Sequence, residues 1–248
     1  MQRIAFDVNC SETAFVAPAT GAERTVRYFS PLAEVPFCGH ATIATGVQLG
    51  QLTGDGTYLL HTSAGDVPVT VRTRGALREA SLTSVAPRSE PAAPALVREA
   101  LALLRWSEGD LDPAIPPARA YAGAWHLVLA VKTTQRLATL DYDFEGLKAF
   151  MLREQFTTPQ LVWRESPTVF HARNPFPIGG IVEDPATGAA AAALGGYLRA
   201  AGLVSAPMTL TIHQGHDIGR PSLITVDIPA EGGIVVTGNA VPLETPAS

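Results

Sequence analysis

The 248-residue chain has few of the residues and motifs on which cofactor and metal chemistry usually depend. Lysine occurs only at Lys132 and Lys148, so Schiff-base chemistry has just two candidates. The glycine-rich phosphate-binding, dinucleotide-binding, zinc-protease and serine-hydrolase motifs do not occur in the sequence. These absences disfavour nucleotide cofactors, P-loop chemistry and zinc-protease chemistry.

Cysteine and long apolar runs are equally scarce. The two cysteines are Cys10 and Cys38, and no uninterrupted apolar run approaches the roughly 20 residues of a membrane helix. The N-terminal residues do not have the profile of a signal peptide. A net charge of -5 disfavours nucleic acid as a partner. We expect a cytoplasmic protein with free thiols, without membrane association and without a nucleic-acid partner.

The chain is well supplied with residues that can form a core, since 46% are hydrophobic and 17% are charged. Short segments rich in β-branched and aromatic residues, such as 25–29, 126–131 and 169–173, are typical of strands. Among them lie two segments rich in alanine and glycine, 41–49 and 189–198, and the second is apolar on nearly every side. A helix of that kind is usually buried. The pattern predicts an α+β fold in which strands surround two buried helices.

The two helical segments follow similar residues at a constant spacing. Pro36 and Pro185 are 185 − 36 = 149 positions apart, and Gly39 and Gly188 are 188 − 39 = 149 apart. This self-similarity indicates a duplicated unit and two pseudo-symmetric domains; chance similarity between two helices rich in alanine and glycine is the alternative. We place the domains at residues 1–111 and 112–248, on either side of the start of a proline-rich segment.

Both helical segments begin where backbone N–H groups have no partner within the helix. Such an end attracts anions, because the unpaired donors and the helix dipole point outward together. If the duplication is real, two helix N-termini could face one cleft, which would suit a small carboxylate substrate.

The motifs around these helix starts resemble those of the PhzF-type isomerases of phenazine biosynthesis. The resemblance extends over essentially the whole chain, in the family's order, through residues 11–16, 27–31, 34–40, 180–188 and 214–222. It implies a diaminopimelate-epimerase-like fold: two similar domains, each a curled, mostly antiparallel sheet around a central helix, with the active site between them. It also implies proton transfer without a cofactor, and a homodimer.

Transferred position by position, the resemblance implies that Glu12 is the acid/base and that His40 and Asp184 complete the catalytic set. The substrate-binding residues that we expect around the two helix starts are Ser30, Gly39, Thr187, Gly188 and Ala189. The best-known activity of the family isomerises trans-2,3-dihydro-3-hydroxyanthranilate. We therefore expect an isomerase that shifts a proton on a small carboxylated substrate of this kind.

This chemistry needs a base that becomes the acid on the same face of the substrate. A carboxylate can do both if burial raises its pKa toward neutrality. Negative charge grows on the substrate as the proton leaves, and helix N–H groups are suited to stabilising it.

Cys38 leaves a second interpretation open. PhzF-type proteins usually have alanine or another small residue there, whereas the related diaminopimelate epimerases and proline racemases use cysteine in a similar context. A helix N-terminus lowers the pKa of a thiol, which would help Cys38 act as a base in a thiol-assisted epimerase. Those epimerases need a second cysteine at the other helix, near Pro185, and this chain has none there.

A third interpretation is a binding protein that keeps the cleft without the chemistry. Family members begin with a strand before the helix in which Met1 lies. Either that strand is truly absent, which would leave the first domain less closed, or the start of the sequence was placed too late. His213 and His216 are near neighbours with no third ligand visible in the sequence, which argues against a metal site there.

Overall fold

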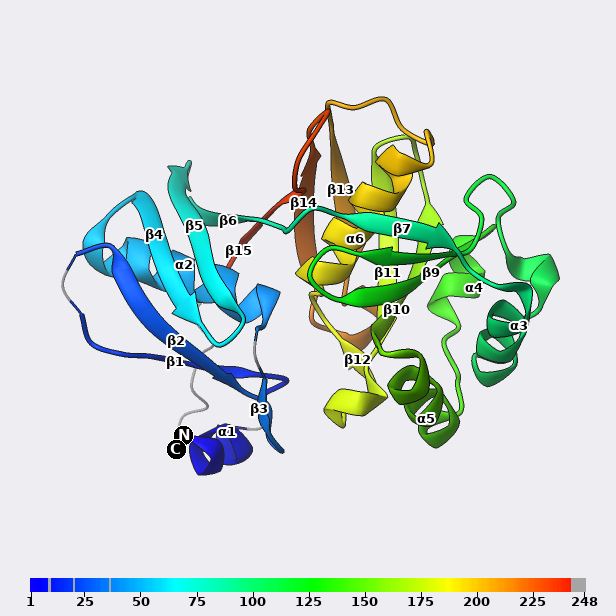
Figure 1. The fold of residues 1–248 in the computed structure, drawn as a ribbon, viewed down its shortest axis with the longest axis horizontal. Coiled ribbons are helices and arrows are strands. Elements are labelled where there is room, and N and C mark those ends of the chain that lie inside the picture. The colour runs from blue at the N-terminus through cyan, green and yellow to red at the C-terminus, as the bar shows by residue number, and fades with distance from the viewer. Residues whose placement is uncertain (9, 20, 36, 242–248) are drawn as a thin grey trace. The chain divides into compact units, whose positions relative to one another are not determined.

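The computed structural model describes residues 1–8, 10–19, 21–35 and 37–241. The chain divides into two compact units, of which unit 1 comprises Met1–Leu82 with the C-terminal segment from Thr237, and unit 2 comprises Thr83–Val236 (Figure 1). The boundary expected at 111/112 lies inside unit 2, because Val97, Leu101 and Leu104 pack in the same apolar core as Leu129 and Phe150. No helix of the described residues is long and apolar enough to cross a membrane.

Unit 1 contains a sheet and one long helix. Its strand order is β1 (Thr13–Val16), β2 (Glu23–Phe29), β4 (Gly56–Thr62), β5 (Gly65–Arg74) and β6 (Leu77–Thr83), with β3 (Glu34–Val35) paired to β2. β2 and β4 run parallel, while β1–β2, β2–β3, β4–β5 and β5–β6 are antiparallel. The helices are α1 (Gln2–Val8) and α2 (Gly39–Thr53).

Helix α2 packs closely on the sheet of unit 1 because glycine faces the strands. A Cβ on Gly46 would lie 2.6 Å from Cγ1 of Val69 in β5, and one on Gly50 would lie 2.5 Å from Cγ1 of Val71. Eight of the fifteen residues of α2 are buried, including Ile43 and Val47. The helix that begins at Gly39 is therefore packed closely on its own sheet.

Unit 2 is larger and contains a mixed sheet. Its strand order is β14 (Ser222–Ile228), β13 (Met208–Gln214), β11 (Val169–Pro175), β10 (Phe156–Arg164), β9 (Trp125–Val131), β8 (Ala118–Tyr121) and β7 (Arg88–Pro91), with β12 (Glu183–Asp184) paired to β11. β9–β10 and β11–β13 are parallel. β15 (Val235–Asn239) runs from unit 2 into unit 1.

The helices of unit 2 cover this sheet (Figure 1). They are α3 (Pro94–Leu103), α4 (Thr134–Ala138), α5 (Phe144–Glu154) and α6 (Gly188–Ala200), together with the short 3₁₀ helices η1 (Glu108–Asp110), η2 (Pro177–Gly179) and η3 (His216–Ile218). Ten of the thirteen residues of α6 are buried, as expected for a helix that is apolar on nearly every side. α3 and α5 share the apolar core with the strands β9 and β10.

The two units repeat one topology. In each, a two-residue strand pairs with a longer one just before the central helix: Phe29 is opposite Glu34, and Pro175 is opposite Glu183. The strand after the helix then pairs in parallel with that same longer strand, β4 with β2 and β13 with β11. The expected α+β fold with two pseudo-symmetric parts is confirmed, and the sheets are mixed rather than purely antiparallel.

The 149-residue spacing also holds for structurally equivalent positions. α2 begins at Gly39 and α6 at Gly188. Gly46 contacts β5, and Gly195, which is 195 − 46 = 149 positions later, contacts Val226 of the equivalent strand β14. Pro36, which the sequence pairs with Pro185, lies outside the described residues.

Candidate active site

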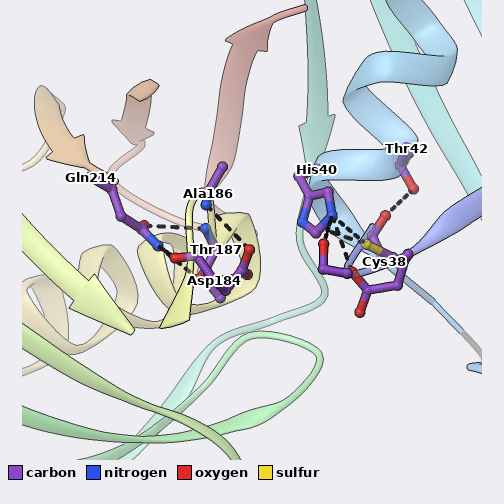
Figure 2. A network of polar contacts seen from close by, with 9 residues as sticks. Cys38, His40, Thr42, Asp184, Ala186, Thr187 and Gln214 are labelled. Carbon is purple, nitrogen blue, oxygen red and sulfur yellow. Dashed lines mark hydrogen bonds and ion pairs between the residues drawn. The ribbon is translucent and has the colours of Figure 1, made fainter. Parts of the chain in front are cut away.

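Three of the chemically active side chains of unit 1 meet at the start of α2 (Figure 2). Oε2 of Glu12, directly before β1, lies 3.1 Å from Nε2 of His40 in the first turn of the helix. Sγ of Cys38, the N-cap residue, lies 3.4 Å from Nε2 and 3.6 Å from Nδ1 of the same ring. Oγ of Ser11 is 3.2 Å from His40 Nε2. The imidazole is therefore the shared partner of the cluster.

The carboxylate of this cluster is buried while its histidine partner reaches solvent. The side chain of Glu12 is 8% exposed and that of His40 is 27% exposed. A buried carboxylate is costly unless a positive or hydrogen-bonding group compensates it. His40 Nε2, 3.1 Å from Glu12 Oε2, is the group placed to compensate it, so the two residues depend on each other.

The pKa of Glu12 does not follow the direction expected from burial alone. Burial raises it, but the hydrogen bond and charge of His40, with contacts to Ser11 and Cys38, outweigh that effect. The net result is a pKa below the ordinary value of 4.5. Glu12 is therefore a carboxylate at neutral pH, poised as a base. The expectation of a pKa raised toward neutrality is wrong for this state of the protein.

Cys38 shows the opposite balance. Burial raises the pKa of its thiol above the ordinary 9.0, although His40 and the Ala41 backbone N–H favour the thiolate. The carbonyl of Cys38 accepts a 2.6 Å hydrogen bond from Thr42 Oγ1, which ties the residue to the first turn of α2. The sequence suggested that the helix N-terminus lowers the pKa of the Cys38 thiol. In the structure this pKa is raised instead.

Unit 2 contains a second polar cluster, at the start of α6 (Figure 2). Oδ1 and Oδ2 of Asp184 accept hydrogen bonds from the Ala186 N–H (3.3 Å) and from Thr187 Oγ1 (2.8 Å). Gln214 accepts from the Thr187 N–H through Oε1 and donates through Nε2 to the Asp184 carbonyl at 2.7 Å. One buried glutamine thus fixes the loop that leads into the helix.

The other predicted binding residues have different surroundings. The hydroxyl of Ser30 closes the turn after β2, accepting from the Ala33 N–H and donating to the Ala33 carbonyl. Gly39 and Gly188 are the first residues of α2 and α6, where backbone N–H groups have no partner within the helix. Ala189 follows in the first turn of α6.

The predicted catalytic residues therefore form two clusters: Glu12 and His40 in unit 1, and Asp184 with Thr187 in unit 2. Sequence reasoning missed Gln214 as a member of the second cluster. The available signal was its place as a polar residue at the end of an alternating strand, just before Gly215. Position 215 requires glycine, because its φ is 76° and a Cβ on this residue would lie 2.2 Å from the Arg220 carbonyl oxygen.

Two groups of side chains have the composition of a metal site. The ligand atoms of Glu12, Cys38 and His40 all lie within 4.8 Å of one another. The structure also supplies a third histidine, His171, beside His213 and His216, with ring centroids 5.0 and 5.7 Å apart along the row. The first pair of rings is stacked and the second is edge-to-face, and among the described residues only the first group brings three ligand atoms together.

Comparison with known proteins decides the family. The family model described as PhzC-PhzF, phenazine biosynthesis-like protein, matches residues 1–245. The chain belongs to this family. The trans-2,3-dihydro-3-hydroxyanthranilate isomerase of Pseudomonas fluorescens is 33% identical over 97% of this chain and 85% of its own length. An uncharacterized isomerase of Bacillus subtilis, YfhB, is 29% identical over 99% of this chain and 86% of its own length. Like these relatives, this PhzF-family protein is an isomerase.

Solved structures agree on the fold. A PhzF-family protein of Bacillus anthracis has a TM-score of 0.83 at 24% identity, covering 97% of this chain and 85% of its own. A hydroxyproline epimerase of Agrobacterium vitis has a TM-score of 0.61 at 13% identity, and the match covers 92% of this chain and 71% of the epimerase chain. The PhzF-type fold is thus related in architecture to that of the epimerases.

The role of Gln214 can be tested by Gln214→Leu. Leucine has a similar size but cannot bond the Thr187 N–H or the Asp184 carbonyl, and each buried group left unpaired costs roughly 1–3 kcal/mol. We expect the free energy of unfolding, measured by urea denaturation, to fall by that order. Gln48→Leu on the exposed side of α2 is the control and should change it by less than about 0.5 kcal/mol. Equal losses in both variants would contradict the role given to Gln214.

Proposed function

We propose that this isomerase moves a proton within a small carboxylated substrate without a metal or an organic cofactor, and that Glu12 carries the proton. The observation that supports this most is the contact between the buried Glu12 carboxylate and His40, which keeps a base ionised where little water reaches it. A base with a low pKa in the free protein gains proton affinity when substrate displaces water and adds negative charge nearby.

The proposed step is a proton shift between two carbons on one face of the substrate. Glu12 removes the proton from the first carbon, and the electron pair of that C–H bond enters the π-system of the substrate. The protonated Glu12 then donates the same proton to a second carbon, so the carboxylate is regenerated and atoms balance. His40 contacts the oxygen Oε2 and orients the carboxyl group through both steps.

The substrate carboxylate is assigned in this proposal to a helix start. The N–H groups at Gly39 in α2 and at Gly188 in α6 are suited to an anion by charge and direction. Asp184 and Thr187 shape the second of these starts through their mutual hydrogen bond. The activity named for the Pseudomonas fluorescens relative makes trans-2,3-dihydro-3-hydroxyanthranilate the first substrate to test. A homodimer stays a prediction.

Glu12→Gln tests the proton carrier. The amide keeps the shape of the side chain but cannot take a proton, so we expect turnover of trans-2,3-dihydro-3-hydroxyanthranilate to fall by about 10²–10⁴-fold. Binding of the substrate, followed by thermal shift, should be largely kept. Glu23→Gln is a matched control, because that side chain is 69% exposed. Turnover of Glu12→Gln within twofold of the unaltered protein would reject Glu12 as the carrier.

If this compound is not turned over, a panel of small cyclic and unsaturated carboxylates can be screened by thermal shift. Each compound that binds is then incubated in D₂O and examined by NMR for exchange at carbon. Exchange that requires Glu12 supports the proposal with a different substrate. Binding of several carboxylates with no exchange in any would instead support a binding protein without chemistry.

A thiol-assisted epimerase is the second candidate, favoured by the 3.4 Å distance from Cys38 Sγ to His40 Nε2. Two observations weigh against it. The thiol pKa is raised by burial, and the position equivalent to Cys38 before α6 is Thr187, 187 − 38 = 149 residues later, which cannot act as a second thiol.

Cys38→Ala separates the two candidates. If Glu12 alone carries the proton, turnover should stay within about tenfold of the unaltered protein, because alanine fills the site without removing the base. If the thiol is a second acid/base group, turnover should fall by about 10²-fold or more. The measurement is kcat/KM with whichever of the compounds tested above is turned over. Cys10→Ala serves as the control for loss of a thiol elsewhere.

A further inference from the structure

The donor set at the start of α2 has a property that a proton-transfer site does not require. It combines a thiol, an imidazole and a carboxylate, which are the three ligand types that Zn²⁺ takes in proteins. Their ligand atoms, from Cys38, His40 and Glu12, lie within 4.8 Å of one another. A single carboxylate with sulfur and nitrogen is poorly suited to Mg²⁺ or Ca²⁺, which prefer several oxygens.

Two of the three distances inside this set are close to those of a zinc site. With Zn–S of about 2.3 Å and Zn–N and Zn–O of about 2.0–2.1 Å, tetrahedral angles place sulfur and nitrogen about 3.5 Å apart and nitrogen and oxygen about 3.3 Å apart. The corresponding distances here are 3.4 Å for Cys38 Sγ to His40 Nε2 and 3.1 Å for His40 Nε2 to Glu12 Oε2. The three atoms could surround one ion with little movement.

Two of these ligands lie on the backbone at the start of α2. Cys38 and His40 flank Gly39 at the start of a helix packed on the sheet, and Thr42 Oγ1 bonds the Cys38 carbonyl at 2.6 Å. The one adjustment concerns the imidazole: Sγ is nearly equidistant from its two nitrogens, so the ring has to turn until Nε2 faces the ion. The side chain of His40 is 27% exposed, so it is not fully enclosed by protein.

We propose that Glu12, Cys38 and His40 form a three-ligand site for a soft divalent cation of the Zn²⁺ type. The fourth position would be left to water or to an oxygen of a bound carboxylate, as in other zinc sites with three protein ligands. A carboxylate that coordinates the ion cannot accept a proton. Bound Zn²⁺ therefore inhibits the isomerase, a consequence that rests on the function proposed for Glu12, whereas the metal site itself does not.

Metal binding to the full chain is the direct test. Protein treated with a chelator and dialysed is titrated with Zn²⁺ by calorimetry, and with Co²⁺ by absorbance spectroscopy. We expect one ion per chain and a sulfur-to-cobalt charge-transfer band. Cys38→Ala should weaken Zn²⁺ binding by at least 100-fold and abolish the band. Mg²⁺ should not compete.

Two control variants locate the ion. Cys10→Ala removes the other thiol, and His213→Gln disrupts the row of histidines on unit 2, the competing place for a soft cation. Both should bind Zn²⁺ like the unaltered protein. Binding that is lost in His213→Gln but kept in Cys38→Ala, or no stoichiometric binding in the unaltered protein, would overturn the proposal. Thermal unfolding of each variant without metal checks that its fold is intact.

Turnover in the presence of Zn²⁺ separates this inference from the proposed function. Inhibition that follows occupancy and is reversed by chelator supports both. If Zn²⁺ binding is weakened in both Cys38→Ala and Glu12→Gln but bound Zn²⁺ leaves turnover unchanged, the metal site stands and Glu12 is not the proton carrier. If Zn²⁺ does not bind while Glu12→Gln is inactive, the metal site is rejected and the proposed function stands.

Discussion

The contact between Glu12 and His40 is the interaction on which the chemistry of this protein depends. Burial by itself raises the pKa of the Glu12 carboxyl group and so favours its neutral form, which cannot take a proton from carbon. His40, at 3.1 Å, contributes most to the opposite effect, and together with Ser11 and Cys38 it leaves the pKa below its ordinary value. The protein thereby keeps an ionised carboxylate with little hydration. Hydration would make this carboxylate a less reactive base.

The duplicated topology explains how this contact is held in place. Each unit presents the start of a buried helix that is fixed on its own sheet through glycine, at Gly46 in α2 and at Gly195 in α6. The two starts have diverged in chemistry. The first carries Cys38 and His40 and faces Glu12, whereas at the second Thr187 occupies the position equivalent to Cys38 and bonds Asp184. A shared scaffold thus supports one cluster suited to proton transfer and one suited to polar binding.

Much of this could be predicted from the sequence because the informative features are local. Spacing of glycine and apolar residues indicated two buried helices, and the motifs around Glu12, Gly39 and Asp184 indicated the family. What the sequence could not supply depends on distances between segments. The pKa of Glu12 results from a competition between burial and His40, and the place of Gln214 beside Thr187 follows from the pairing of β11 with β13. The domain boundary also depends on packing, since α3 shares a core with strands that follow the proline-rich segment.

The most direct test of this account is the pKa of Glu12 itself, measured by NMR titration of protein with ¹³C-labelled glutamate carboxyl groups and assigned with Glu12→Gln. The account predicts a pKa below 4.5 in the unaltered protein. In His40→Leu, which removes the charge and the hydrogen bond but leaves the carboxyl group buried, the pKa should rise above that value. A Glu12 pKa at or above 4.5 in the unaltered protein, or one that does not change when His40 is replaced, would contradict it.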